Sequence, residues 1–226
     1  MSRIVHLCFF ILFIFALIGC YFLNYSDNFN DNFTGDEWCL IEWSGEHATL
    51  KENHHRLEFT ADAGVENGAD YQLCGIQIDT TRNFAYKVGW HLRKASGPGT
   101  FALCLGLAVS NSNDIVIGAG YDEGFTYFNC YSETANIDYT KPRKTTNGTV
   151  YISYNANRDI LYLSINGYWR PENRLAGDYV VRGLLQGAWA NKKVFAFLEG
   201  DTESSDAIVP GDAWFDNFIL WQGQNP

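Results

Sequence analysis

Aromatic and amide side chains alternate along residues 125–131. Phe125, Tyr127, Asn129 and Tyr131 have the same parity, so in a strand they would point to one face. The C–H face of a sugar ring packs on an aromatic side chain, and an amide hydrogen-bonds its hydroxyl groups. We therefore expect Tyr127, Asn129 and Tyr131 to contact a glycan. The alternative is that these aromatic residues only fill a core.

A second aromatic candidate follows an Asn-Gly turn at residues 166–167. Trp169 and Arg170 come next, and Pro171 ends strand pairing, so a projecting loop is expected. An indole at a loop tip is suited to stacking on a sugar or a partner protein, with Arg170 near enough to hydrogen-bond. The alternative is that Trp169 folds back and closes one end of the fold. Trp189, near a second bend, leaves the same two alternatives open.

Histidines are weaker candidates. His91 alternates outward beside Lys87 and Arg93, which makes it either a groove residue or an ordinary surface histidine, and the surface is favoured. The adjacent pair His54-His55 lies in a polar stretch and would point two ways from a strand. It is a poor chelate, and a solvated turn is expected.

Motifs for catalysis are missing. The chain has no Gly-x-Ser-x-Gly elbow and no glycine-rich loop between a strand and a helix, so serine hydrolysis and nucleotide binding have no support. Its acidic clusters, Asp122-Glu123 and residues 199–203, are expected at turns between strands. Turns position carboxylates less reproducibly than a strand does.

The composition describes one acidic globular domain. The 226 residues carry 16 Lys and Arg against 26 Asp and Glu, a formal charge of −10, which argues against a nucleic-acid partner. Hydrophobic residues at 46% and charged residues at 19% exclude a disordered chain. The length provides for one sizeable core.

The first 23 residues differ from the rest. Arg3 precedes an apolar run that ends in small residues, as in a secretory signal covering residues 1–19. Residues 17–20, Leu-Ile-Gly-Cys, resemble the lipobox of bacterial lipoproteins, which implies lipidation of Cys20. Residues 4–23 also reach the length of an uncleaved membrane anchor, and plain secretion is the third alternative. All three predict export, and the first two predict attachment to a membrane at the cell envelope or surface.

Export makes four cysteines informative: Cys39, Cys74, Cys104 and Cys130. An even number in an oxidising compartment permits two disulfides, with three connectivities. The alternative is that they are small buried side chains. Their wide spacing argues against a zinc site.

Strand patterns recur through the exported part. Residues 84–92 alternate cleanly, and residues 101–109 are apolar on both parities, as in a central strand covered on both faces. A hairpin is expected from residues 149–155 and 160–166, with Leu161, Leu163 and Ile165 inward. Only residues 180–190 have helical spacing. Further strands are expected at residues 115–120, 125–132, 194–199 and 214–221.

Three segments carry a family resemblance. Residues 27–33, Asp-Asn-Phe-Asn-Asp-Asn-Phe, open the domain and Trp38 follows; residues 150–155 and 160–167 are paired strands ending in Asn-Gly; residues 213–221 contain Phe-Asp-x-Phe. In this order they resemble the concanavalin A-like lectin/glucanase superfamily. The resemblance implies an all-β, two-sheet antiparallel jelly-roll sandwich over residues 27–222, after a tether at 20–26 and before a tail at 223–226.

The resemblance also guides the functional expectation. Catalytic glycoside hydrolases of this superfamily carry Glu-x-Asp-x-x-Glu on one strand, and that spacing does not occur here. We therefore expect a non-catalytic surface domain that binds a polysaccharide or surface glycan, or is adhesive. One alternative is a glycoside hydrolase or lyase with carboxylates supplied from loops, such as Asp122, Glu123 and Glu199. Another is a structural envelope lipoprotein without a small ligand.

Asp216 is the best polar candidate within the apolar closing strand, where an unpaired carboxylate would cost several kcal/mol. Related sandwiches often hold a structural calcium through an Asp of the last strand. The resemblance thus implies Asp216 as a side-chain calcium ligand, with Asp31 or the Gly45 carbonyl as further ligands. The alternative is that Asp216 simply faces water.

Overall fold

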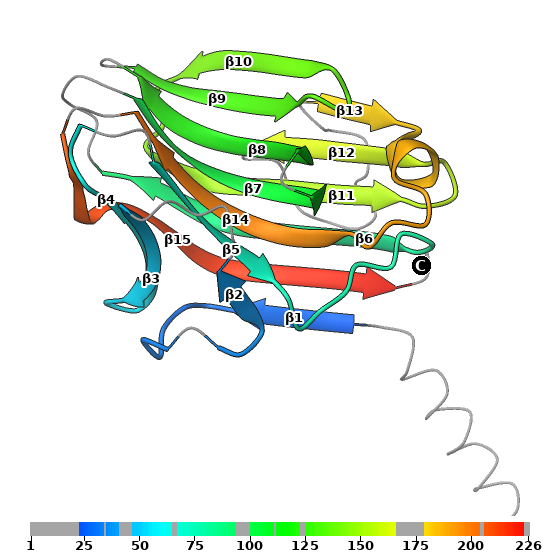
Figure 1. Ribbon diagram of the computed structural model, residues 1–226, viewed down its shortest axis with the longest axis horizontal. Coiled ribbons are helices and arrows are strands. Elements are labelled where there is room, and N and C mark those ends of the chain that lie inside the picture. Colours follow the sequence, from blue (N-terminus) through cyan, green and yellow to red (C-terminus); the bar gives the residue numbers. More distant parts are fainter. Residues whose placement is uncertain are drawn as a thin grey trace, which may run out of the picture.

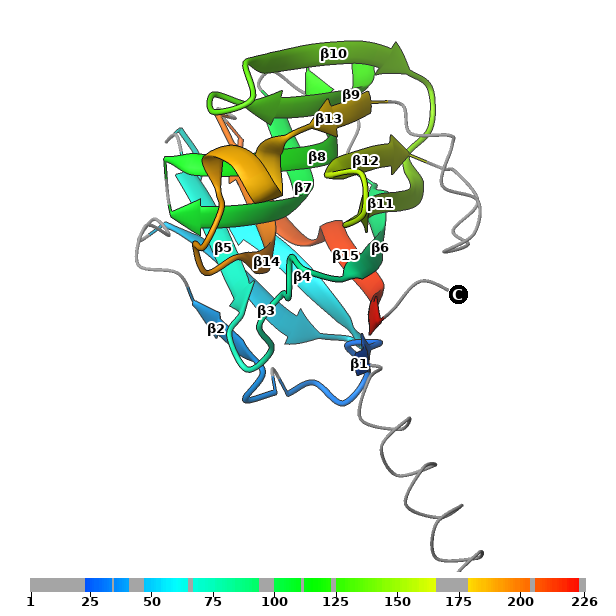
Figure 2. The same cartoon turned by 90° about the vertical axis from the view of Figure 1, so that its right-hand side faces the viewer.

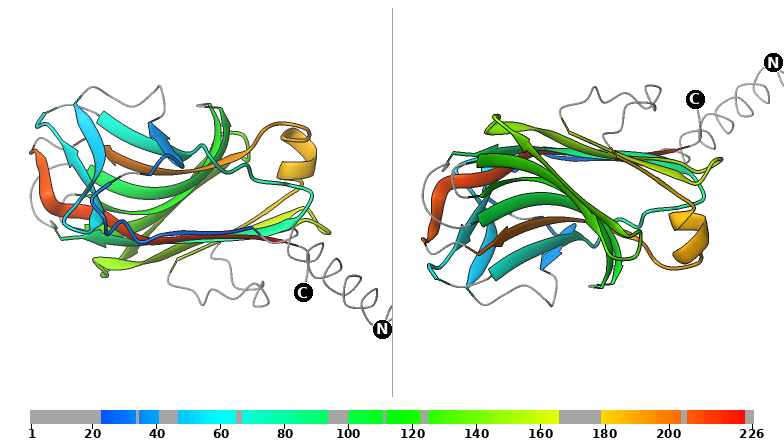
Figure 3. Two further views of the ribbon diagram at one scale, coloured as in Figure 1. Left: turned by 90° about the horizontal axis from the view of Figure 1, so that it is seen from below. Right: turned by 90° about the horizontal axis from the view of Figure 1, so that it is seen from above.

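The computed structural model describes residues 23–33, 35–40, 47–64, 67–93, 100–110, 112–122, 125–165, 179–203 and 206–223. These residues form two antiparallel sheets packed face to face (Figures 1 and 3). The all-β, two-sheet jelly-roll prediction is confirmed. Among the described residues, no helix is long and apolar enough to cross a membrane.

One sheet has eight strands within the described part of the chain. Seven of them follow the order β13-β12-β11-β6-β15-β4-β3, and β1 pairs with β15 (Figure 1). Their bounds are β13 (Tyr179–Arg182), β12 (Ile160–Ile165), β11 (Asn147–Asn155), β6 (Asn83–Leu92), β15 (Ile208–Gly223), β4 (Arg56–Ala61), β3 (Ala48–Asn53) and β1 (Leu23–Asp27).

The facing sheet has seven strands among the same residues, in the order β10-β9-β8-β7-β14-β5-β2. Their bounds are β10 (Ile137–Arg143), β9 (Phe125–Ser132), β8 (Asn113–Asp122), β7 (Thr100–Ser110), β14 (Phe195–Thr202), β5 (Asn67–Leu73) and β2 (Trp38–Leu40). Figure 1 shows that β7, β8 and β14 curve strongly along their length.

The core lies between the two sheets and is rich in aromatic residues. Strand β6 supplies alternate side chains to it, and all of them are at most 1% exposed: Phe84, Tyr86, Val88, Trp90 and Leu92. The alternation predicted for residues 84–92 is therefore confirmed. The predicted hairpin is also present as β11 and β12, with Leu161, Leu163 and Ile165 in the core.

Strand β7 is buried on both faces, as its sequence predicts. Leu103, Leu105 and Leu107 point into the main core. Ala102 and Cys104 have the other parity and belong to a second apolar cluster on the outer face of the sheet, the face away from the core. This outer cluster explains why both parities of the strand are apolar.

The N-terminal tether predicted at residues 20–26 is corrected in part. Residues 23–27 form β1, which pairs with β15 over five residues. The strand is held because Tyr25 packs on Phe218, at 6.1 Å between ring centroids, and because Asp27 accepts a hydrogen bond from the Trp38 indole at 2.8 Å. The signal or anchor at residues 1–22, with the lipidation residue Cys20, lies outside the described residues.

The helical spacing at residues 180–190 gives less helix than predicted. Residues 179–182 are strand β13, and only Leu184–Ala188 form one helical turn, η1. Gly183 has a φ of 70° and separates the two. This turn connects the two sheets at one end of the sandwich (Figure 2).

Candidate functional site

A cleft of about 370 Å³ opens on the outer face of the seven-stranded sheet. Its lining residues come from β7, β8, β9 and β14, and those of β7 have the parity opposite to that of the core residues. The described residues that line it are Thr100, Phe101, Ala102, Cys104, Asp114, Val116, Tyr127, Asn129, Tyr131, Glu199, Asp201, Thr202 and Glu203.

One wall of the cleft is the outward face of β9. The structure brings Tyr127, Asn129 and Tyr131 together there, as the alternation predicts, and Tyr131 is 40% exposed. Tyr127 lies opposite Gly120 of β8, where a Cβ atom would be 2.4 Å from the phenol ring. A glycine at this position therefore leaves the space that the Tyr127 ring occupies.

The floor is made of small residues. A Cβ atom at Gly118 would lie 2.4 Å from the Cys104 sulfur and 2.5 Å from the Leu103 carbonyl oxygen. The Cys104 thiol in turn donates a long hydrogen bond of 4.0 Å to the Asn129 side chain. This close packing fixes the Asn129 amide at the base of the aromatic wall.

Carboxylates form the opposite wall. Glu199 and Asp201 lie on the same face of β14, and Glu199 stands between Cys104 of β7 and Asp70 of β5 in the strand register. The prediction that residues 199–203 form a turn is wrong for these two residues. Burial, followed by the charges of Asp70, Asp201 and Asp114, raises the pKa of Glu199 well above its usual range.

The raised pKa favours the protonated form of Glu199, which can donate a hydrogen bond. Burial also raises the pKa of Asp114, on the far side of the cleft floor, and the charge of Glu133 adds to this effect. The cleft thus combines aromatic faces, an amide and carboxyl groups, two of which have raised pKa values. Such a set can bind hydroxyl groups and can donate or accept a proton.

No protein-family model and no curated protein sequence matches the chain. Solved structures match it over most of their length. An endo-1,3-β-glucanase from Streptomyces sioyaensis has a TM-score of 0.58 and 10% identity, covering 90% of this chain and 97% of the other. The Emp46p carbohydrate recognition domain has a TM-score of 0.53 and 12% identity, and the match covers 87% of this chain and 95% of the other. The winged bean acidic lectin, complexed with methyl-α-D-galactose, has a TM-score of 0.52 and 14% identity. The match covers 90% of this chain and 100% of the other.

The chain has the concanavalin A-like lectin/glucanase fold. The identities of 10–14% extend this likeness to the fold alone.

His91 is not part of the cleft of this concanavalin A-like domain. It lies on β6, on the outer face of the other sheet, where its ring stacks on Trp214 at 4.7 Å with an interplanar angle of 7°. Arg56 covers the Trp214 ring at 4.1 Å from its centroid. Burial lowers the pKa of His91, opposed by the nearby Asp216 charge. His91 therefore packs on Trp214. It lies away from the cleft because β6 belongs to the eight-stranded sheet.

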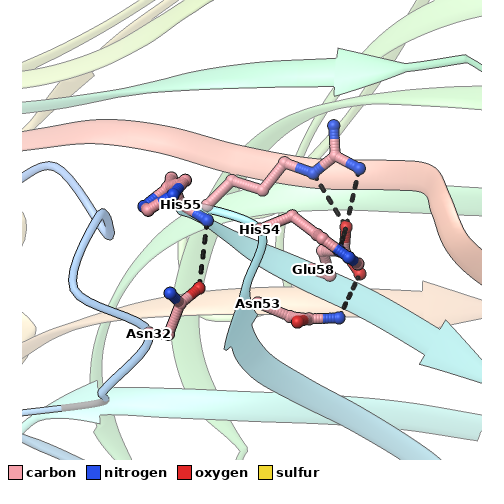
Figure 4. A network of polar contacts seen from close by, with 6 residues as sticks. Asn32, Asn53, His54, His55 and Glu58 are labelled. Atoms are coloured by element: carbon pink, nitrogen blue, oxygen red, sulfur yellow. Dashed lines mark hydrogen bonds and ion pairs between the residues drawn. The ribbon is translucent and has the colours of Figure 1, made fainter.

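The His54-His55 turn is confirmed, with φ angles of 53° and 63° between β3 and β4. Glu58, only 2% exposed, accepts hydrogen bonds from Arg56 and Asn53 and faces His54 at 3.5 Å (Figure 4). The His55 backbone N–H donates to Asn32 at 3.1 Å. These contacts tie the turn to the N-terminal segment.

Asp216 lies half-buried on the outer face of β15, opposite Gly89. A bulge after it shifts the inward parity, so that Phe215 and Phe218 both enter the core. In the described part of the chain, no group of three or more His, Cys, Asp or Glu residues is arranged to hold a metal ion. Gly45 lies outside that part. A calcium ion bound by Asp216 therefore remains a prediction from the family resemblance.

The remaining candidates lie in the core, beside the cleft or outside the described residues. Trp189 is fully buried and belongs to the core. Asp122 ends β8 and accepts a hydrogen bond from Thr100 at 3.0 Å, beside the cleft. Trp169, Arg170 and Glu123 lie outside the described residues.

The sequence interpretation missed Asp114, Glu199 and Asp201 as members of one site. A signal was present, because residues 199, 201 and 203 are acidic at every second position and directly follow an apolar run. That spacing places all three side chains on one face if the strand continues.

Proposed function

We propose that the cleft on the seven-stranded sheet binds a glycan and that the chain is a non-catalytic, surface-located binding or adhesive domain. The observation that carries the proposal is the meeting of Tyr127, Tyr131 and Asn129 with carboxyl groups in one hollow of about 370 Å³. This volume lies within the usual range for small-ligand sites.

The chemistry of the walls fits a saccharide. Tyr127 and Tyr131 offer ring faces for the C–H groups of a pyranose. Asn129 and Asp201 accept hydrogen bonds from its hydroxyl groups, and protonated Glu199 donates one. Two structural neighbours, a carbohydrate recognition domain and a lectin complexed with methyl-α-D-galactose, support this ligand class.

The charge of the site favours neutral glycans over anionic ones. Four carboxyl groups line the cleft, and its described lining includes no Lys, Arg or His. A uronic acid or a sulfated sugar would add a negative charge beside them, in a chain that already carries −10. We therefore expect neutral oligosaccharides to bind and their anionic analogues to be rejected.

Titration calorimetry tests the proposal. Neutral oligosaccharides should bind the wild-type chain, and Tyr127→Ala should weaken that binding by about 1–2 kcal/mol, or roughly tenfold. Phe33→Ala is the matched control, because Phe33 is 65% exposed and does not line the cleft. Equal affinities of Tyr127→Ala and wild type would reject the cleft as the binding site.

Glycoside hydrolysis is a second candidate, favoured by the position of Glu199 and Asp201. Residues two apart on one strand face stand about 6.8 Å apart at their Cα atoms, so both carboxyl groups point into the same cleft, as the carboxyl pair of a glycosidase must. Protonated Glu199 would be the acid, and Asp201 the nucleophile or base. The neighbouring endo-1,3-β-glucanase supports this alternative.

A reducing-sugar assay separates the two candidates. A binding domain releases no reducing ends from any glycan it binds. An enzyme does, and its Glu199→Gln variant would bind the glycan but lose at least 100-fold in turnover. Phe33→Ala is again the control and should retain full turnover.

We also propose that the domain is exported and held at the membrane, through a lipid on Cys20 or an uncleaved anchor. The support is the apolar N-terminal run and the Leu-Ile-Gly-Cys segment. Strand β1 begins three residues after Cys20, so a lipid there would hold the sandwich close to the bilayer.

A further inference from the structure

Four cysteines lie in the described part of the chain, and all four are free thiols. Cys39 and Cys74 are partly exposed, whereas Cys104 and Cys130 are buried. The sequence leaves three ways of pairing them open. Their positions in the seven-stranded sheet distinguish between these ways.

Cys39 and Cys74 meet at one edge of the sheet. Cys39 lies on the edge strand β2 opposite Gln72 of β5, and Cys74 follows β5 directly. The Cys74 backbone N–H donates to the Glu37 carbonyl at 2.8 Å, which continues the pairing by one residue. Cys39 and Cys74 are therefore diagonal neighbours on one face of the sheet, where side chains reach each other.

The Cys74 thiol lies beside β2. It donates a hydrogen bond of 3.4 Å to the Glu37 carbonyl oxygen, two residues before Cys39. Burial and the neighbouring thiol raise the pKa of Cys39 to about 11, while the Lys193 charge opposes the shift. The fold thus places both thiols on one face of the same sheet edge in the reduced protein.

Cys104 and Cys130 cannot form the second pair. Cys104 lines the cleft on the outer face, whereas Cys130 packs in the main core on the inner face. Strand β8 also lies between their strands β7 and β9. Two cysteines whose Cβ atoms point to opposite faces of a sheet cannot be joined without moving the backbone.

Mixed pairs between the two sets are excluded by distance. Strands β14 and β5 separate β7 from β2, which puts Cys39 about 14 Å from the β7 backbone. Strand β14 separates β7 from β5, which puts Cys74 about 10 Å from it, and β9 lies further still. A disulfide requires Cα atoms within about 7 Å.

We propose that the four described cysteines form one disulfide, between Cys39 and Cys74, and that Cys104 and Cys130 remain thiols. The oxidant is a small disulfide such as oxidised glutathione. One cysteine thiolate attacks it, its S–S bond breaks, and one glutathione thiolate leaves. The second cysteine thiolate attacks the mixed disulfide, forms the Cys39–Cys74 bond and releases the second glutathione. The two protons lost by the cysteines go to the two glutathione thiolates, and two electrons pass to the oxidant.

The bond would clamp an edge strand of three residues. Among the described strands, β2 pairs with β5 alone, so it is the element most easily detached from this edge. The closed loop, residues 39–74, contains strands of both sheets, including β3 and β4 of the eight-stranded sheet. Closing a loop of this length restricts the unfolded chain.

Peptide mapping by mass spectrometry tests the pairing. The full chain is equilibrated with reduced and oxidised glutathione, its free thiols are alkylated in denaturant, and the digest is mapped. Among the four described cysteines we expect one linked peptide pair, Cys39 with Cys74, and alkylated Cys104 and Cys130 in every buffer. Alkylated Cys39 and Cys74 in the most oxidising buffer, or a link to Cys104 or Cys130, would overturn the proposal.

A thermal melt supplies the second readout. Oxidation should raise the Tm of the wild-type chain by roughly 5–10 °C. The rise should vanish in Cys39→Ser and in Cys74→Ser, and persist in the matched variant Cys130→Ser. Each variant is compared with its own reduced form, so a lower overall stability does not obscure the result. A rise that persists in Cys39→Ser would refute the pairing.

Discussion

Glu52 is a buried carboxyl group whose environment holds its proton. It is 3% exposed, and one of its oxygens accepts a hydrogen bond from the Phe33 backbone N–H at 3.0 Å. Burial raises the pKa of Glu52 to about 7, aided by a hydrogen bond to Asp31 and by the charge of Asp27. In the unfolded chain the same group titrates near pH 4.3.

This difference predicts how stability depends on pH. Between about pH 4.3 and pH 7 the folded chain holds a proton that the unfolded chain has lost. The Glu52 contribution is therefore fully present below pH 4.3 and is lost as the pH rises through about 7. The free energy of unfolding changes through Glu52 by at most about 1.4 kcal/mol per pH unit.

Urea unfolding at several pH values checks this expectation. The free energy of unfolding of the wild type should fall between pH 5 and 7 by more than that of Glu52→Gln, which carries no titrating proton. Glu37→Gln, a change of the same type at an exposed residue, is the control. Parallel curves for the wild type and Glu52→Gln would show that Glu52 titrates normally.

At the same scale, the carboxylates of the cleft show where sequence interpretation fails. Glycine, aspartate and threonine at 200–202 are turn-forming residue types, so the sequence favours a turn. Gly200 instead lies inside β14. The position requires glycine, because a Cβ atom there would be 2.2 Å from the Phe59 ring of the facing sheet. That contact is set by the packing of two sheets and leaves no local signal in the sequence.

Among the elements, strand β8 determines the depth of the cleft. Its outward positions 118 and 120 are glycines, and β7 beside it contributes Ala102 and Cys104. At Gly118 an added Cβ would press on the backbone of β7, 2.5 Å from the Leu103 carbonyl oxygen, and backbone cannot move aside cheaply.

We therefore expect Gly118→Ala to destabilise the chain by about 1–3 kcal/mol. Gly187→Ala is the matched control, since nothing lies within 4 Å of its added Cβ and it should be neutral or slightly stabilising. Thermal melts of both variants measure the contrast. Equal melting temperatures would mean that β7 and β8 are less tightly apposed than described here.

Element prediction from the sequence succeeds where one face is buried throughout. Strands β6 and β7 are recognised because each inward side chain meets the facing sheet. Strand β1 is missed because its five residues, Leu-Asn-Tyr-Ser-Asp, are mostly polar and too few to mark a strand, and because its pairing with β15 comes from the other end of the chain. The bulge after Asp216 is missed for the same reason, because a parity shift depends on the partner strand.

For the whole molecule, membrane attachment is the expectation most simply tested in cells. Metabolic labelling with a palmitate analogue should mark the wild type and miss Cys20→Ser, while Cys8→Ser, a change in the same apolar segment, should be labelled like the wild type. Equal labelling of Cys20→Ser and wild type would reject a lipid on Cys20 and leave the uncleaved anchor or secretion.

The central claim is that a glycan occupies the cleft between β9 and β14. A crystal structure of the chain with the glycan that binds best on an array tests it most directly. The account predicts a sugar ring on Tyr127 or Tyr131, with hydroxyl groups hydrogen-bonded to Asn129, Glu199 or Asp201. A sugar bound on the eight-stranded sheet, or an array on which the chain binds no glycan, would contradict it.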